Sequence, residues 1–154
     1  MPLEIERKFL VLGDDWRALA HGSHSICQGY LAHGDVSIRV RIINGASAVL
    51  TLKADADGIS RKEFEYDVPL ADAGEMLALA TGALVEKTRH LVPDGSLTWE
   101  IDEFSGQNAG LVIAEVELHS ASQELQLPAW LGAEVSDDGR YYNAALSERP
   151  YTTW

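Results

Sequence analysis

The chain has 154 residues, with 12 Lys and Arg against 24 Asp and Glu, a formal net charge of −12, and 46% apolar residues. This length and composition predict one globular domain over residues 1–154 and exclude a disordered, collagen-like or coiled-coil chain. The single cysteine, Cys27, excludes an internal disulfide framework and a cysteine-rich zinc site. No apolar run is long enough to span a membrane, and the amino-terminal residues lack a signal-peptide pattern, so we expect a cytoplasmic protein.

The acidic net charge argues against nucleic acid and membranes as partners. An acidic protein can still bind a small anionic ligand, provided that its cations gather in one place. The position of the 12 cations along the chain is therefore the informative feature.

Turn signals such as Asn44-Gly45 and Asp57-Gly58 divide the chain into short segments typical of hairpins. Between the turns we expect eight strands with short connections and largely antiparallel pairing. Their ranges are 3–11, 25–32, 37–44, 48–54, 61–69, 83–92, 97–104 and 111–119. We expect helices over residues 14–21, 71–80 and 137–147, and one helical turn at 122–125. Gly82 is placed to end the second helix.

Charged residues follow the two-residue period of these strands. Because side chains alternate between the two faces of a strand, Glu4, Glu6 and Lys8 share one face. The other face of that strand is apolar, with Arg7 as a charged exception. Seven strands repeat this division. The charged faces collect the cations Lys8, Arg39, Arg41, Lys53, Arg61, Lys87 and Arg89, and the carboxylates Glu4, Glu6, Glu63, Glu65, Glu100, Asp102, Glu115 and Glu117.

An ordinary sheet with one solvated face is one explanation for this division. A solvated face usually mixes neutral polar residues and sets opposite charges across strands, whereas here like charges repeat along a strand, as at Arg39 and Arg41. Like charges repel unless a polyanion and a metal ion lie between them. We therefore predict an α+β fold, an eight-stranded antiparallel β-barrel with a charged lumen and helices packed on its outside. An open cleft is an alternative that alternation does not exclude.

The segment Glu4-Ile5-Glu6-Arg7-Lys8 resembles the Glu-x-Glu-x-Lys signature near the amino terminus of the CYTH superfamily, also called triphosphate tunnel metalloenzymes. Further elements similar to that family follow in order over essentially the whole chain. They are Gln28-Gly29-Tyr30-Leu31, Ser37-Ile38-Arg39-Val40-Arg41, Leu52-Lys53, Arg61-Lys62-Glu63-Phe64-Glu65, Glu86-Lys87-Thr88-Arg89, Trp99-Glu100-Ile101-Asp102, Glu115-Val116-Glu117 and Asp138-Gly139-Arg140-Tyr141-Tyr142-Asn143. The likeness is greatest to the small bacterial inorganic triphosphatases. It implies hydrolysis of tripolyphosphate to pyrophosphate and phosphate, with Mg²⁺ or Mn²⁺, inside an eight-stranded tunnel.

The charged residues divide between the roles that this chemistry needs. Phosphoryl transfer requires charge neutralisation and positioning of the phosphates. The predicted substrate-binding cations are Lys8, Arg39, Arg41, Lys53, Arg61, Lys87 and Arg89. The predicted metal ligands, a set that the resemblance supports, are Glu4, Glu6, Asp102, Glu115 and Glu117. Glu63, Glu65 and Glu100 are expected to hold the arginines in place.

The predicted catalytic residues are Lys8, Tyr30, Glu4 and Glu6. Lys8 either clamps phosphate or joins Tyr30 in the pair that the resemblance suggests for handling the water or the leaving group. Arg61 follows a turn, so a solvated strand end is an equal alternative for it. Tyr142 is interpreted as a packing residue.

Other functions share this fold. A nucleoside or thiamine triphosphatase and a class IV-type adenylyl cyclase are the alternatives, and a non-catalytic polyphosphate or nucleotide binder is a third class. The acidic pairs favour catalysis, because a binder needs the cations but not the metal ligands. The sequence does not fix the oligomeric state, and a homodimer stays open.

Overall fold

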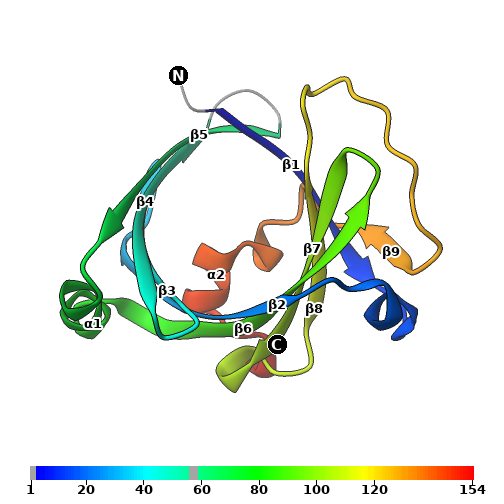
Figure 1. Ribbon diagram of the computed structural model, residues 1–154. Helices are drawn as coiled ribbons and strands as arrows, with labels where there is room; N and C mark the ends of the chain where they lie inside the picture. Colours follow the sequence, from blue (N-terminus) through cyan, green and yellow to red (C-terminus); the bar gives the residue numbers. More distant parts are fainter. Residues whose placement is uncertain (1–2, 56–58) are drawn as a thin grey trace.

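The computed structural model describes residues 3–55 and 59–154. Strands β1 to β8 form an antiparallel sheet that closes where β5 pairs with β1, so the predicted eight-stranded barrel is confirmed (Figure 1). The turn predicted at Asp57-Gly58 lies outside the described residues. The strands are β1 Leu3–Val11, β2 Ser23–Ala32, β3 Val36–Ile43, β4 Ser47–Asp55, β5 Ser60–Val68, β6 Thr81–Asp94, β7 Leu97–Ser105 and β8 Val112–Glu117.

A ninth strand, β9 (Leu131–Glu134), was not predicted. It pairs with β1 at Phe9 and Val11, on the edge of β1 whose first residues pair with β5. The chain then stays on this edge, because the Val135 N–H donates to the carbonyl oxygen of Lys8 at 2.8 Å. The carboxyl-terminal segment is thereby positioned beside the seam between β1 and β5.

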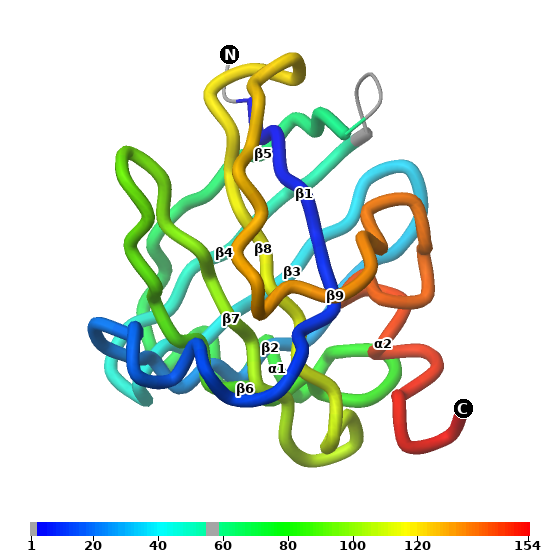
Figure 2. The backbone as a smooth tube through the Cα atoms, turned by 90° about the vertical axis from the view of Figure 1, so that its right-hand side faces the viewer, coloured from blue at the N-terminus to red at the C-terminus, as the bar shows by residue number. Residues whose placement is uncertain are grey.

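Apolar side chains pack on the outside of the barrel wall. Helix α1 (Leu70–Ala78) covers β3 and β4, and its Ala73 packs with Val40 and Ala48. A second cluster, around Trp99 and Trp130, includes Leu125 of the long segment before β9. Figure 2 shows the course of that segment. The 3₁₀ helix η1 (Asp15–Leu19) is shorter than the predicted helix, and the helical turn predicted at 122–125 is wrong, because that segment has no helix.

Helix α2 (Asn143–Glu148) departs from the expectation that helices pack outside. The predicted helix 137–147 is divided into the 3₁₀ helix η3 (Gly139–Tyr141) and α2, because Tyr142 between them is extended at φ −73° and ψ 141°. Leu146 is fully buried against Val85, Phe104 and Ile113, which share the lumen-facing side of their strands. Helix α2 therefore fills one end of the barrel, as Figure 1 shows.

Gly82 allows this placement rather than ending α1. It has φ +76°, and a Cβ there would lie 2.5 Å from the carbonyl oxygen of Ser147. Only glycine combines this backbone conformation with so close an approach. The remaining 3₁₀ helices are η2 (Gly106–Asn108) and η4 (Tyr151–Thr153). Over the two described ranges, no helix combines the length and apolar character that crossing a membrane requires.

Candidate active site

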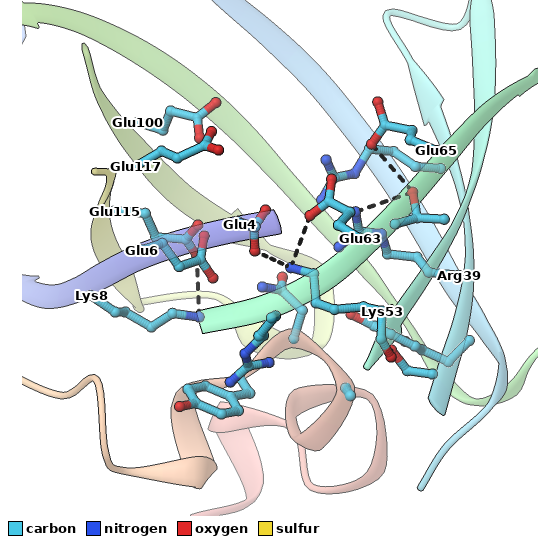
Figure 3. A pocket seen from close by; sticks show the side chains of 18 of the residues that line it. Glu4, Glu6, Lys8, Arg39, Lys53, Glu63, Glu65, Glu100, Glu115 and Glu117 are labelled. Atoms are coloured by element: carbon cyan, nitrogen blue, oxygen red, sulfur yellow. Dashed lines mark hydrogen bonds and ion pairs between the residues drawn. The ribbon is translucent and has the colours of Figure 1, made fainter. Parts of the chain in front are cut away.

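The barrel encloses a cavity of about 280 Å³ (Figure 3). Strand alternation sends every second side chain of a strand into it, and most of these side chains are charged. Its lining contains Glu4, Glu6, Lys8, Tyr30, Arg39, Arg41, Lys53, Arg61, Glu63, Glu65, Arg89, Glu100, Glu115 and Glu117, together with Ser37, Thr51, Tyr142, Asn143 and Ala144. Two further predicted residues, Lys87 and Asp102, are buried in the wall.

The cationic side of the cavity centres on β3. The Arg41 Nε–H donates to Gln28 Oε1 at 2.6 Å, and the Arg39 Nη2–H donates to Thr51 Oγ1 at 3.4 Å. Burial, followed by the charges of Arg39 and Arg89, lowers the pKa of Arg41 to about 9. The buried Nε of Arg39 has no hydrogen-bond partner among the described residues. These cations therefore lack counter-charge that a bound anion would supply.

One carboxylate anchors two cations beneath this surface. Lys87 Nζ lies 2.7 Å from Asp102 Oδ2, and Arg89 Nε lies 2.8 Å from Oδ1. Burial acts to raise the pKa of Asp102, but Arg89 and Lys87 outweigh it and lower that pKa. Burial also lowers the pKa of Lys87 to about 7. Both oxygens of Asp102 already contact these two cations. The predicted metal contact of Asp102 and the predicted phosphate contact of Lys87 therefore stay predictions.

The acidic side is formed by β1 and β8. Their register sets Glu6 opposite Glu117 and Lys8 opposite Glu115, and Lys8 Nζ lies 3.2 Å from Glu115 Oε1. Burial, followed by the charge of Glu115, raises the pKa of Glu6 to about 7. Like charges facing each other across strands are unfavourable without a counter-ion.

Carboxylate oxygens crowded in this way suit a hard divalent cation. Glu4, whose Oε1 lies 2.8 Å from Lys53 Nζ, lines the same side of the cavity. In the described ranges, no three His, Cys, Asp or Glu side chains already converge as a metal site. The donor chemistry fits such an ion, and the predicted ligand roles stay predictions.

Of the three carboxylates expected to hold the arginines, Glu100 contacts an arginine directly, whereas Glu63 contacts a lysine. Glu63 Oε2 lies 3.6 Å from Lys53 Nζ, and Glu100 Oε2 lies 3.2 Å from Arg89 Nη1. Glu65 acts through Thr51, whose hydroxyl donates to Glu65 Oε2 at 3.4 Å. The supporting role of the three carboxylates stays a prediction.

Lys8 contacts a different tyrosine from the one expected. Its Nζ lies 4.9 Å from the ring centroid of Tyr142, which also lies 4.2 Å from the guanidinium carbon of Arg61. Tyr30 is on β2, opposite Arg39, and its ring stacks on His33 at 5.2 Å. Arg61 lines the cavity and is half-buried, and its role in substrate binding stays a prediction.

Sequence reasoning missed five polar residues of the site: Gln28, Ser37, Thr51, Tyr142 and Asn143. Gln28 and Thr51 occupy lumen-facing positions of β2 and β4, so extending the strand period to neutral polar residues would have found them. Tyr142 and Asn143 lie at a helix break, where no strand period applies.

The sequence matches the CYTH domain family over residues 2–149. It is 44% identical over 153 residues to an inorganic triphosphatase of Acetivibrio thermocellus, covering 98% of this chain and 97% of that protein. An inorganic triphosphatase of Nitrosomonas europaea is 41% identical over 152 residues, covering 94% and 96%. The crystal structure of the inorganic triphosphatase NE1496 matches with a TM-score of 0.66 and 32% identity, covering 96% of this chain and 95% of that chain. With its closed barrel and charged lumen, the chain belongs to the CYTH domain family.

Proposed function

We propose that this chain hydrolyses inorganic triphosphate to pyrophosphate and phosphate, with Mg²⁺ or Mn²⁺ as the metal. The observation that carries the proposal is the cavity whose cationic and acidic sides face one another within about 280 Å³. The names of the two relatives, both inorganic triphosphatases at 44% and 41% identity, support it.

The cationic side binds and orients the substrate. Arg39, Arg41 and Arg89 line the cavity on β3 and β6. A guanidinium donates to two phosphate oxygens at once, so these side chains orient the triphosphate as well as neutralising its charge. Their burial strengthens each contact, because little water competes for the phosphate oxygens.

The acidic side holds the metal. Glu4, Glu6, Glu115 and Glu117 present carboxylate oxygens to the cavity, and Glu6 lies opposite Glu117. A divalent ion there supplies positive charge to phosphate oxygens and lowers the pKa of a bound water. Lys8 lies on the acidic side, beside Glu115, and neutralises charge on the phosphate nearest the carboxylates. Tyr30 offers a hydroxyl at the cationic side.

The lining favours an inorganic substrate over a nucleoside or thiamine triphosphate. Apart from Ala144 and the two tyrosines, the lining residues are charged or carry hydroxyl or amide groups. Sites for drug-sized organic ligands are mostly apolar and span roughly 300–1,000 Å³. The organic half of such a substrate would have to lie outside this cavity.

Phosphate release from tripolyphosphate, ATP, GTP, thiamine triphosphate and pyrophosphate, each with Mg²⁺, Mn²⁺ or EDTA, tests the proposal. We expect metal-dependent turnover with a clear preference for tripolyphosphate. A Glu4→Ala, Glu6→Ala double variant is the matched control and should lose that turnover. Equal rates in both proteins contradict hydrolysis at this site. Cyclic AMP from ATP would identify a cyclase, and tight binding without turnover under any metal would identify a binder.

A further inference from the structure

Two adjacent residues of the carboxyl-terminal segment reach cations on opposite sides of the lumen. Tyr142 and Asn143 stand at the break between η3 and α2, and both line the cavity. We propose that they are positioning residues, which hold the phosphate-binding cations in their productive orientation without carrying charge themselves. This inference rests on the proposed function and assigns to the end of the chain a part in the same site.

Tyr142 joins the two strands that close the barrel. Its ring lies 4.2 Å from the guanidinium carbon of Arg61 on β5 and 4.9 Å from Lys8 Nζ on β1. Among the described residues these strands pair over Leu3 to Ile5 of β1, so the ring joins Arg61, within the paired stretch, to Lys8, beyond it. An aromatic face attracts cations, and it offsets the repulsion between two positive groups that approach the same phosphate.

The orientation of the Tyr142 ring is fixed from its far end. The phenol hydroxyl donates to the carbonyl oxygen of Ser136. The hydroxyl of Ser136 in turn accepts from the backbone N–H of Lys8 at 3.0 Å. The ring is therefore tied to the same strand position whose side chain it contacts.

Asn143 organises the cationic side through a chain of buried hydrogen bonds. Its Oδ1 accepts from Lys87 Nζ at 2.9 Å and from Gln28 Nε2 at 3.2 Å. The fully buried Gln28 then presents Oε1 to Arg41 Nε at 2.6 Å. Since Gln28 must point its nitrogen at Asn143, its oxygen necessarily points at Arg41. One neutral amide thus sets the direction of a lysine on β6 and an arginine on β3.

The experiment compares Tyr142→Leu, Tyr142→Phe and Asn143→Ala with the wild-type chain. Leu146→Val is the matched control, because Leu146 packs in the same helix against Val85, Phe104 and Ile113. For each protein, kcat and KM for tripolyphosphate are measured with Mg²⁺. The rise in Tm caused by tripolyphosphate is measured in EDTA, which isolates the cations from the metal.

We expect Tyr142→Leu and Asn143→Ala to lower kcat/KM by about tenfold and to reduce the tripolyphosphate-induced rise in Tm. Tyr142→Phe keeps the ring but loses the hydroxyl that orients it, so it should recover part of the loss, whereas Leu146→Val should lower only the Tm of the unliganded protein. If either substitution prevents folding, Tyr142→Met or Asn143→Ser replaces it, since neither restores the lost contact in full.

The inference would be overturned if Tyr142→Leu and Asn143→Ala had the same kcat/KM as the wild-type chain and the same tripolyphosphate-induced rise in Tm. A wild-type chain that hydrolyses no triphosphate would instead overturn the proposed function. In that case the Tm shifts in EDTA still decide whether the two residues position the anion-binding cations.

Discussion

The two sides of the lumen follow the same strand period but are neutralised in different ways. On β3, Arg39 and Arg41 are held by neutral groups, the hydroxyl of Thr51 and the amide of Gln28. Across β1 and β8, Glu115 is paired with Lys8, whereas Glu6 faces the like charge of Glu117. Each side therefore lacks the charge that one part of a metal–phosphate ligand carries.

The two sides therefore contribute differently to the stability of the unliganded protein. The cationic side is anchored from below by Asp102, so its charges are partly compensated within the wall. The acidic side keeps the pKa of Glu6 raised through burial and Glu115, which means that its ionised form is unfavourable there. Removing a charge should consequently destabilise one side and stabilise the other.

The largest effect is expected from Asp102→Asn. This isosteric change removes the buried carboxylate that Lys87 and Arg89 share and leaves Arg89 with Glu100 alone, so the free energy of unfolding should fall by about 3–5 kcal/mol. Urea denaturation in EDTA at pH 7 measures it. Glu103→Gln is the matched control on the outer side of β7, where the carboxylate pairs with the partly exposed Arg17. Its loss should stay below about 1 kcal/mol. A similar loss in both variants would show that Asp102 is no special anchor.

The opposite sign is expected for Glu6→Gln. The folded-state pKa of Glu6 is raised from 4.5 to about 7, so the stability that its protonated form contributes is present below pH 4.5 and lost as the pH rises through 7. Replacing it should stabilise the metal-free protein at pH 7.5 by about 2–3 kcal/mol and leave it unchanged at pH 4. Denaturation in EDTA at both pH values measures this, with the exposed Glu75→Gln as control. A variant that is less stable at pH 7.5 contradicts the account.

Arg41→Lys tests the geometry of the cationic side at constant charge. Lysine lacks the planar fork in which Nε–H donates to Gln28 while the two Nη groups stay available to phosphate oxygens, so kcat/KM should fall about 10–100-fold. Steady-state phosphate release measures the loss. Arg140→Lys is the control, because Arg140 is exposed and pairs with Asp138 outside the cavity. Similar rates for Arg41→Lys and wild type would show that charge alone matters at this position.

The strand period predicted most of the candidate site because it acts locally. Alternation fixes the direction of each side chain once a strand forms, so Arg39, Arg89 and Glu115 were found without knowing how the strands pair. The direction of a side chain does not determine whether it reaches the cavity or stays buried in the wall. Asp102 has the predicted direction, yet it lies below the cavity between two cations, which depends on the pairing of β6 with β7.

The carboxyl-terminal segment could not be predicted in the same way. Its helical pattern is real, but the sequence does not show that α2 enters the barrel, because the apolar residues that receive Leu146 come from three separate strands. Those residues, Val85, Phe104 and Ile113, continue the lumen-facing period with apolar side chains. A switch from charged to apolar residues within one period is therefore a signal for a filled barrel end.

The smallest effect concerns Arg7, the charged exception on the apolar face of β1. The unpredicted strand β9 explains it, because Arg7 Nη2 lies 2.6 Å from Glu134 Oε1. The side-chain hydrogen bond from Arg7 lowers the pKa of Glu134, so the stability that this pair contributes is present above the unfolded-state pKa and lost as the pH falls through the lower folded value.

Because the side chains of Arg7 and Glu134 are 25% and 36% exposed, Glu134→Gln should reduce the free energy of unfolding at pH 7 by only about 0.5–1 kcal/mol. Urea denaturation at low salt and in about 1 M NaCl measures it, since salt screens an exposed pair. The loss should shrink in salt, whereas the loss in Asp102→Asn should persist. A large, salt-independent loss in Glu134→Gln would contradict this account, because an exposed ion pair would then not be the source of the contribution.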